Sequence, residues 1–194
     1  MGRLESPRAA RLTVLLATLL GATSVGPHRA LDDYVLALIA RGEGATLGLV
    51  RGKLDLFLFT TGDPANNREL MDTGLMLPWW TDPHLRIAFF RPLSSFTHLA
   101  DEWLWPSSAL LMHAHSLLWF AALLATVAVL YRRLEPSPGL AGLSLVLFAM
   151  DDAHGLALAW LANRNALIAT LFGCLALMSH DASRRLGNRW AGAL

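Results

Sequence analysis

Apolar residues are gathered into long runs that short polar segments separate, and this pattern predicts helices that cross a membrane. A helix needs about 20 residues to cross the hydrocarbon core of a bilayer. The clearest run is Ser108–Tyr131, which is followed at once by Arg132 and Arg133. Together the runs predict four spans, at about residues 12–26, 108–131, 137–153 and 156–179.

The first run, Leu12–Val25, is short for a span and has a second interpretation. A basic segment, a short apolar stretch and small residues near Gly26 are also features of a secretory signal peptide. The residues before Pro27 lack a clean small-x-small cleavage site, which favours an uncleaved span. Cleavage would reduce the predicted spans to three and leave the other assignments unchanged.

Basic residues predict the orientation of the spans, because Lys and Arg are enriched at cytoplasmic ends. The arginines near the runs fit four crossings with both termini in the cytoplasm: Arg3, Arg8 and Arg11, then Arg132 and Arg133, then Arg184, Arg185 and Arg189. We therefore expect an all-α integral membrane protein that forms a single membrane domain over residues 1–194. Its expected location is the bacterial cytoplasmic (inner) membrane.

The long segment between the first two spans, residues 27–107, is expected outside the cytoplasm and partly helical. Asp32 is a good N-cap for a short helix that stops at Gly42. Residues 54–59 (LDLFLF) alternate as a strand does, over too few positions for an assignment, and residues 67–76 form another candidate helix. Aromatic residues and prolines are dense over residues 77–93, which is typical of a loop at the lipid–water boundary.

Composition supports lipid as the environment of the apolar surface. Hydrophobic residues make up 54% of the chain and charged residues 16%, whereas about a quarter of a typical soluble domain is charged. The formal net charge of +1 argues against nucleic acid as a partner. The single cysteine, Cys174, excludes an intrachain disulfide.

Ionisable residues at membrane depth are costly, so they are functional candidates. The predicted topology places four such groupings outside the membrane or near its outer boundary: Asp32 and Asp33; Arg91; His113 and His115; and Asp151, Asp152, His154 and Arg164. A carboxylate in such a set can deprotonate an incoming hydroxyl as a general base. An arginine can neutralise a phosphate leaving group. A divalent metal held by Asp and His is an alternative, although no ligand spacing supports it.

Each grouping also has a purely structural interpretation. Asp32 can cap its helix, and Arg91 can anchor the aromatic loop at the interface. His113 and His115 lie two residues apart and therefore point to different helix faces, where either one can bond a neighbouring helix.

The acidic pair between the third and fourth spans can also be structural. Asp151 and Asp152 can mark the exit from the membrane. Arg164 is flanked by two asparagines inside an apolar helix, and it can pair with either aspartate instead of binding a substrate.

Three segments resemble polytopic GT-C-type glycosyltransferases, including relatives of protein O-mannosyltransferases. They are LDDYV, FRPLSSFTHLADEWLWPSSALLMHAHSLLWFAALLATVAVLYRRL and DDAHGLALAWLANRNALIATLFGCLAL, which follow one another in this order between Leu31 and Leu177. The resemblance implies a polyprenyl-phosphate-sugar donor and an inverting transfer on the non-cytoplasmic face. It matches Asp32 or Asp33 to the catalytic base, and it matches Arg91, His154 and Arg164 to the donor pocket.

The chain departs from such enzymes in having fewer spans and no soluble acceptor domain. A truncated or inactive form is therefore one expectation. The alternative function is a non-catalytic membrane subunit that binds lipid or a partner membrane protein through its aromatic outer loop, since exposed apolar patches mark interfaces.

Overall fold

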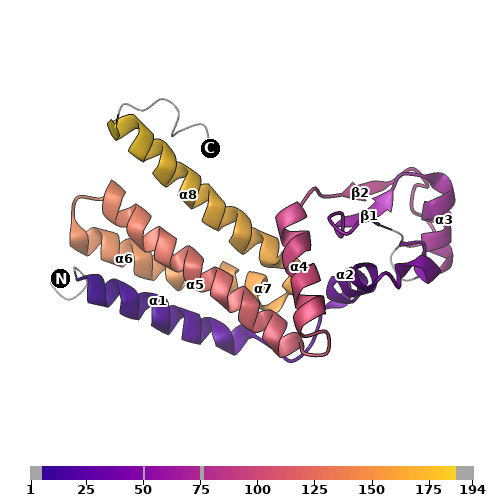
Figure 1. Ribbon diagram of the computed structural model, residues 1–194, viewed down its shortest axis with the longest axis horizontal. Coiled ribbons are helices and arrows are strands. Elements are labelled where there is room, and N and C mark those ends of the chain that lie inside the picture. The colour runs from indigo at the N-terminus through magenta and orange to yellow at the C-terminus, as the bar shows by residue number, and fades with distance from the viewer. Residues whose placement is uncertain (1–5, 50, 75–76, 187–194) are drawn as a thin grey trace. The chain divides into compact units, whose positions relative to one another are not determined.

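A computed structural model describes residues 6–49, 51–74 and 77–186, and these residues are mostly helical (Figure 1). The chain divides into two compact units. The bundle unit comprises the chain up to His28 and from Leu110 onward, and the intervening unit comprises Arg29–Ala109. The intervening unit thus corresponds closely to the segment that was expected between the first two spans.

The bundle unit consists of helices joined by short connections. Its elements are α1 (Pro7–Gly21), a 3-10 turn (Ala22–Ser24), α5 (Ala109–Leu134), α6 (Pro138–Ala149), α7 (Ala153–Ala159), a second 3-10 turn (Leu161–Asn163) and α8 (Arg164–Leu186). α1 begins where the Ser6 hydroxyl accepts the Ala9 N–H at 3.0 Å, with Pro7 in the first turn. Both features favour a helix start, because proline lacks only a hydrogen that the first turn leaves unpaired.

Apolar residues from five helices form the core of the bundle unit. Ala17 of α1, Phe120 of α5, Leu145 of α6, Leu158 of α7 and Leu167 of α8 are all buried in one cluster. The end of α1 approaches this cluster closely, since a Cβ added at Gly21 would lie 2.8 Å from the Leu158 side chain. The helices are therefore held by shared apolar packing, which inside a bilayer stabilises through van der Waals contacts and not through removal of apolar surface from water.

Two helical stretches in the described part of the chain are long and apolar enough to cross a membrane: α5 and Leu161–Arg185. α6 and α7 would make a third if they form one span, which is bent by 51°. α1 has 15 residues, or about 22 Å, and is shorter than the bilayer core of about 30 Å. The helical fold class is confirmed, whereas four crossings stay a prediction.

The third and fourth predicted spans are divided differently in the structure. The fourth was expected from residue 156, but α7 covers that position and ends at Ala159, before Trp160, whose backbone is extended (φ −121°, ψ 109°). α8 then begins only at Arg164. Asp151 and Asp152 consequently lie in the break between α6 and α7 instead of between two complete spans.

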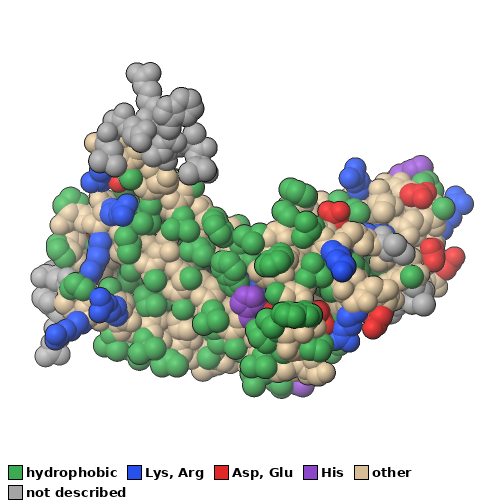
Figure 2. Space-filling model, in the orientation of Figure 1, with side chains coloured by type: hydrophobic (Ala, Val, Ile, Leu, Met, Phe, Trp, Pro, Cys, Tyr) green, Lys and Arg blue, Asp and Glu red, His purple; other side chains and the backbone are tan. Residues whose placement is uncertain are grey.

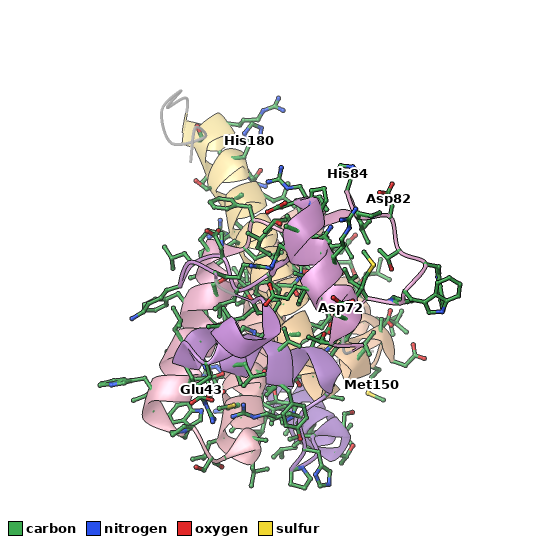
Figure 3. All side chains as sticks on the ribbon, turned by 90° about the vertical axis from the view of Figure 1, so that its right-hand side faces the viewer. Glu43, Asp72, Asp82, His84, Met150 and His180 are labelled. Atoms are coloured by element: carbon green, nitrogen blue, oxygen red, sulfur yellow. The ribbon has the colours of Figure 1, made fainter. Side chains whose placement is uncertain are left out.

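The intervening unit combines short helices with a two-stranded antiparallel sheet. Its elements are α2 (Leu31–Arg41), a 3-10 turn (Gly44–Leu47), β1 (Leu58–Thr61), α3 (Pro64–Asp72), β2 (Arg86–Ala88) and α4 (Pro92–Leu104). Thr61 pairs with Arg86 and Leu58 with Ala88, with an irregularity between them. Asp82 and His84, labelled in Figure 3, lie in the turn before β2, where the Asp82 carboxylate accepts the His84 N–H at 2.8 Å.

The predicted helices of this unit exist, but their starts differ from expectation. α2 stops at Gly42 as predicted, in a left-handed conformation (φ 76°) that glycine adopts without strain. Asp32 is not its N-cap, because the helix begins at Leu31, two residues earlier than expected, and the N-cap is Ala30. The helix expected at residues 67–76 is α3, which starts earlier because the Asp63 carboxylate caps it at Ala65.

Polar side chains that sequence reasoning overlooked hold the intervening unit together. The guanidinium of Arg51 donates to the carbonyl oxygens of Leu58 at 2.6 Å and Phe59 at 3.2 Å. Burial lowers the pKa of Arg51 from its ordinary value. The amide of Asn67, which is fully buried, donates to the carbonyls of Pro83 and Leu85, at 2.7 Å each.

Candidate functional site

The predicted site residues are distributed over both units. Those of the intervening unit are Asp32, Asp33 and Arg91, and those of the bundle unit are His113, His115, Asp151, Asp152, His154 and Arg164. Each set is described within its own unit.

The two aspartates at the start of α2 have different environments. Asp33 is buried, and its carboxylate accepts the backbone N–H of Ala30 at 2.8 Å. This bond satisfies a donor that the first turn of the helix leaves without a partner in the helix. Asp32 is only partly buried and lies in the same first turn. Asp33 therefore has a structural task, and Asp32 presents a carboxylate that solvent can reach.

A cluster around Glu102 fixes α2 against α4. The Glu102 carboxylate lies 2.7 Å from Arg29 Nη1 and 2.8 Å from Arg41 Nη2. Both arginines also donate to the carbonyl of Pro106, at 2.9 and 2.8 Å. Arg29 precedes α2 and Arg41 ends it, so one carboxylate on α4 holds both ends of the helix that carries the aspartates. Sequence reasoning missed this cluster because its members lie more than 60 residues apart.

Arg91 lies at the start of α4 among aromatic rings. Its guanidinium carbon is 4.5 Å from the centroid of the Phe89 ring and 5.1 Å from that of Phe57. Both distances are within the range of cation–π attraction. Burial lowers the pKa of Arg91 from its ordinary value. The side chain is therefore oriented by aromatic contacts, in the same unit as Asp32.

His113 connects three segments of the bundle unit. Its side chain is fully buried, with Nδ1 at 2.9 Å from the carbonyl oxygen of Leu158 and Nε2 at 3.1 Å from that of His28. A carbonyl can only accept, so the imidazole donates in each contact through the nitrogen that carries a proton. The structural interpretation of His113, hydrogen bonding between helices, is confirmed.

His115 faces a different side of α5, as the spacing predicted. It is partly exposed, and its Nε2 accepts the indole N–H of Trp119 at 3.1 Å, one turn along the same helix. This bond is within one helix and does not join α5 to another.

Arg164 lies at the first position of α8 and is fully buried. Its Nε donates to the Ser116 hydroxyl at 2.9 Å, and its Nη2 donates to the Met112 carbonyl at 2.8 Å. Both acceptors belong to α5, so the guanidinium fastens the start of α8 to α5. Arg164 was a candidate because it lies between two asparagines in an apolar segment of the sequence. That pattern did not predict Ser116 and Met112 as its partners.

The acidic pair lies in the break between α6 and α7, and His154 lies in the first turn of α7. The imidazole Nε2 of His154 lies 2.8 Å from the carbonyl oxygen of Phe148, near the end of α6, where the helix leaves carbonyls without partners. Its ring packs between those of Phe120 and Phe148, with centroids 5.0 and 4.9 Å away. Asp151 and Asp152 are exposed, and the Asp151 carboxylate accepts the Ala153 N–H at 2.9 Å.

Among residues 6–49, 51–74 and 77–186, no group of three or more His, Cys, Asp or Glu side chains is placed to hold a metal ion. The roles of the nine site residues in catalysis and donor binding stay predictions. Comparison of the chain with protein-family models, with curated proteins and with solved structures found no match. The resemblance to GT-C-type glycosyltransferases therefore rests on the quoted sequence segments.

Proposed function

We propose that this chain is a glycosyltransferase-like membrane protein that acts on a polyprenyl-phosphate-sugar donor at the non-cytoplasmic face. The main support for the proposal is that the two aspartates of α2 differ in burial and in their hydrogen bonds. Asp33 is committed to the backbone of Ala30, and Asp32 retains a partly exposed carboxylate on a helix clamped at both ends. A general base has to be held in place in this way and still be reachable.

The proposed step is a single displacement. Asp32 takes the proton of an acceptor hydroxyl, the hydroxyl oxygen forms a bond to the anomeric carbon of the sugar, and the bond from that carbon to the phosphate oxygen breaks. The polyprenyl phosphate leaves with the electron pair. Arg91 is the cation of the same unit that we assign to the phosphate, while Arg164 and His154 stay predicted donor-binding residues of the bundle unit.

The first prediction separates the two aspartates. Asp32→Asn should lower sugar transfer by about 100-fold, because removal of a general base costs that much or more. Asp33→Asn should retain transfer, because an amide oxygen can still accept the Ala30 N–H. The measurement is transfer in isolated membranes from polyprenyl-phosphate-linked mannose and glucose to water-soluble acceptors. Full activity of Asp32→Asn would disprove its role as the base.

We also propose that the bundle unit crosses the membrane four times with both termini in the cytoplasm. Arginines gather at one end of the unit, as Figure 2 shows on the face in view. Arg11 and Arg132 line one groove between α1 and α5, and Arg185 donates to the carbonyl of Arg133 at 3.4 Å. The cytoplasmic ends of spans are enriched in such residues.

Reporter fusions test this topology. Alkaline phosphatase fused after Ser107 should be active, because the enzyme matures only outside the cytoplasm. The same enzyme fused at the C-terminus should be inactive, and a green fluorescent protein there should fluoresce. An active phosphatase at the C-terminus would show an odd number of crossings and contradict the four-span topology.

The second candidate function is a non-catalytic membrane subunit. It is favoured by Trp79 and Trp80, which are 83% and 70% exposed in the intervening unit and contact each other edge to face. Absence of both transfer and donor binding by the wild-type chain, with retention of a defined membrane partner through purification, would favour this function over the enzyme.

A further inference from the structure

α4 has its polar and apolar sides reversed relative to a helix of a soluble protein. Its buried side chains are polar: Ser94, Ser95, Thr97, His98 and Asp101. Its exposed side chains are apolar: Leu93 at 40%, Phe96 at 61%, Trp103 at 82% and Leu104 at 52%. These four residues are spaced by three, seven and one positions and lie on one side of the helix, which we call the apolar face of α4.

The contacts of α4 within its unit keep this face outward. The His98 ring packs edge-on against the buried ring of Phe57, with centroids 5.8 Å apart. The carboxylate of Glu102 is fixed by Arg29 and Arg41. Rotating α4 to turn its polar side to water would break these ion pairs. The apolar face therefore stays exposed unless something outside the unit covers it.

Chain connectivity sets where α4 lies relative to a membrane. α4 ends at Leu104 and α5 begins at Ala109, and α5 is long and apolar enough to span a bilayer. The four residues between them extend no further than about 15 Å, and a turn shortens this reach, since the Ser108 N–H donates to the Trp105 carbonyl at 3.0 Å. The end of α4 is thus close to the point where α5 meets the membrane surface.

We propose that the apolar face of α4 is immersed in the lipid bilayer, with the helix lying in the interface on the side where α5 begins. An interfacial helix places its apolar side chains about 5–10 Å into the boundary between headgroups and acyl chains. Trp103 is the most exposed side chain of the face, and tryptophan prefers this boundary because it combines a large apolar ring with one N–H donor. This immersion does not depend on sugar transfer.

Spin labels provide the test in the full chain, reconstituted into nanodiscs of phosphatidylcholine and phosphatidylglycerol. In a Cys174→Ala background, single labels are placed at Phe96→Cys and Trp103→Cys. Asp72→Cys, exposed at the end of α3 and labelled in Figure 3, is the water reference. Leu118→Cys, 69% exposed on α5, is the lipid reference.

Power saturation with oxygen and with a water-soluble nickel chelate then measures what each label contacts. The labels at 96 and 103 should favour oxygen over the chelate, as the label at 118 does, and the label at 72 should do the opposite. Chelate access equal to that at 72 would overturn the proposal, and so would exclusion of both reagents, which would indicate a protein partner on this face. Leu104→Cys replaces either variant that fails to fold.

Discussion

Replacing Arg164 with alanine should lower the free energy of unfolding of the bundle unit by about 3–5 kcal/mol, the cost expected for large buried side chains whose hydrogen bonds are charge-assisted. The guanidinium is fully buried and donates to Ser116 and to the Met112 carbonyl. Alanine removes both bonds and leaves a cavity at the start of α8. The measurement is denaturant unfolding in detergent micelles, followed by circular dichroism.

A second arginine on the same helix is the control for this variant. Arg184 is exposed, so Arg184→Ala should change the stability by no more than about 0.5 kcal/mol. Arg164→Lys keeps the charge and loses the planar guanidinium. Its free energy of unfolding should lie between those of Arg164→Ala and Arg184→Ala. If Arg164→Ala were as stable as Arg184→Ala, the guanidinium would not hold α8 to α5.

Glu102→Ala should destabilise the intervening unit by about 3 kcal/mol, because removal of one partner leaves the other charge poorly solvated. The side chain of Arg29 is only 11% exposed, and alanine would leave it without the carboxylate that lies 2.7 Å away. The effect should appear as faster hydrogen exchange along α2, the helix whose two ends the carboxylate holds.

Two variants test whether the charge of Glu102 is responsible. Glu102→Gln keeps a hydrogen-bond acceptor for one arginine. It should therefore destabilise the unit about half as much as Glu102→Ala does. Asp72→Ala removes an exposed acid from the same unit and should leave the exchange of α2 unchanged. Unchanged exchange in Glu102→Ala would show that packing alone positions α2.

Local sequence signals predicted the elements that depend on neighbouring residues. α5 begins and ends within three residues of the expected run, because a continuous apolar stretch followed by Arg132 and Arg133 defines both ends. Gly42 stops α2 for a similarly local reason. The start of α2 was assigned to Asp32, but the N-cap is Ala30, and Asp33 accepts the Ala30 N–H from inside the first turn, which the residue types alone do not indicate.

The end of α7 before Trp160 and the existence of α4 were not predicted. Asp151 and Asp152 interrupt the apolar residues between α6 and α7, but apolar residues continue from α7 past Trp160, and composition does not register the extended backbone there. α4 was overlooked because its exposed side is the apolar one, so its pattern resembles the approach to the next span. The clusters around Glu102 and Arg164 depend on contacts between distant parts of the chain, which no local pattern encodes.

The pairing of one carboxylate with two arginines also has an evolutionary consequence. Glu102, Arg29 and Arg41 meet at one point, and a substitution of Glu102 leaves two arginines there without their shared carboxylate, whereas a substitution of either arginine leaves one matched ion pair. In relatives of this chain, the two arginine positions should therefore change wherever Glu102 is lost. They should do so even where the aspartates of α2 have been lost, because the ion pairs of Glu102 stabilise the position of α2 and take no part in catalysis.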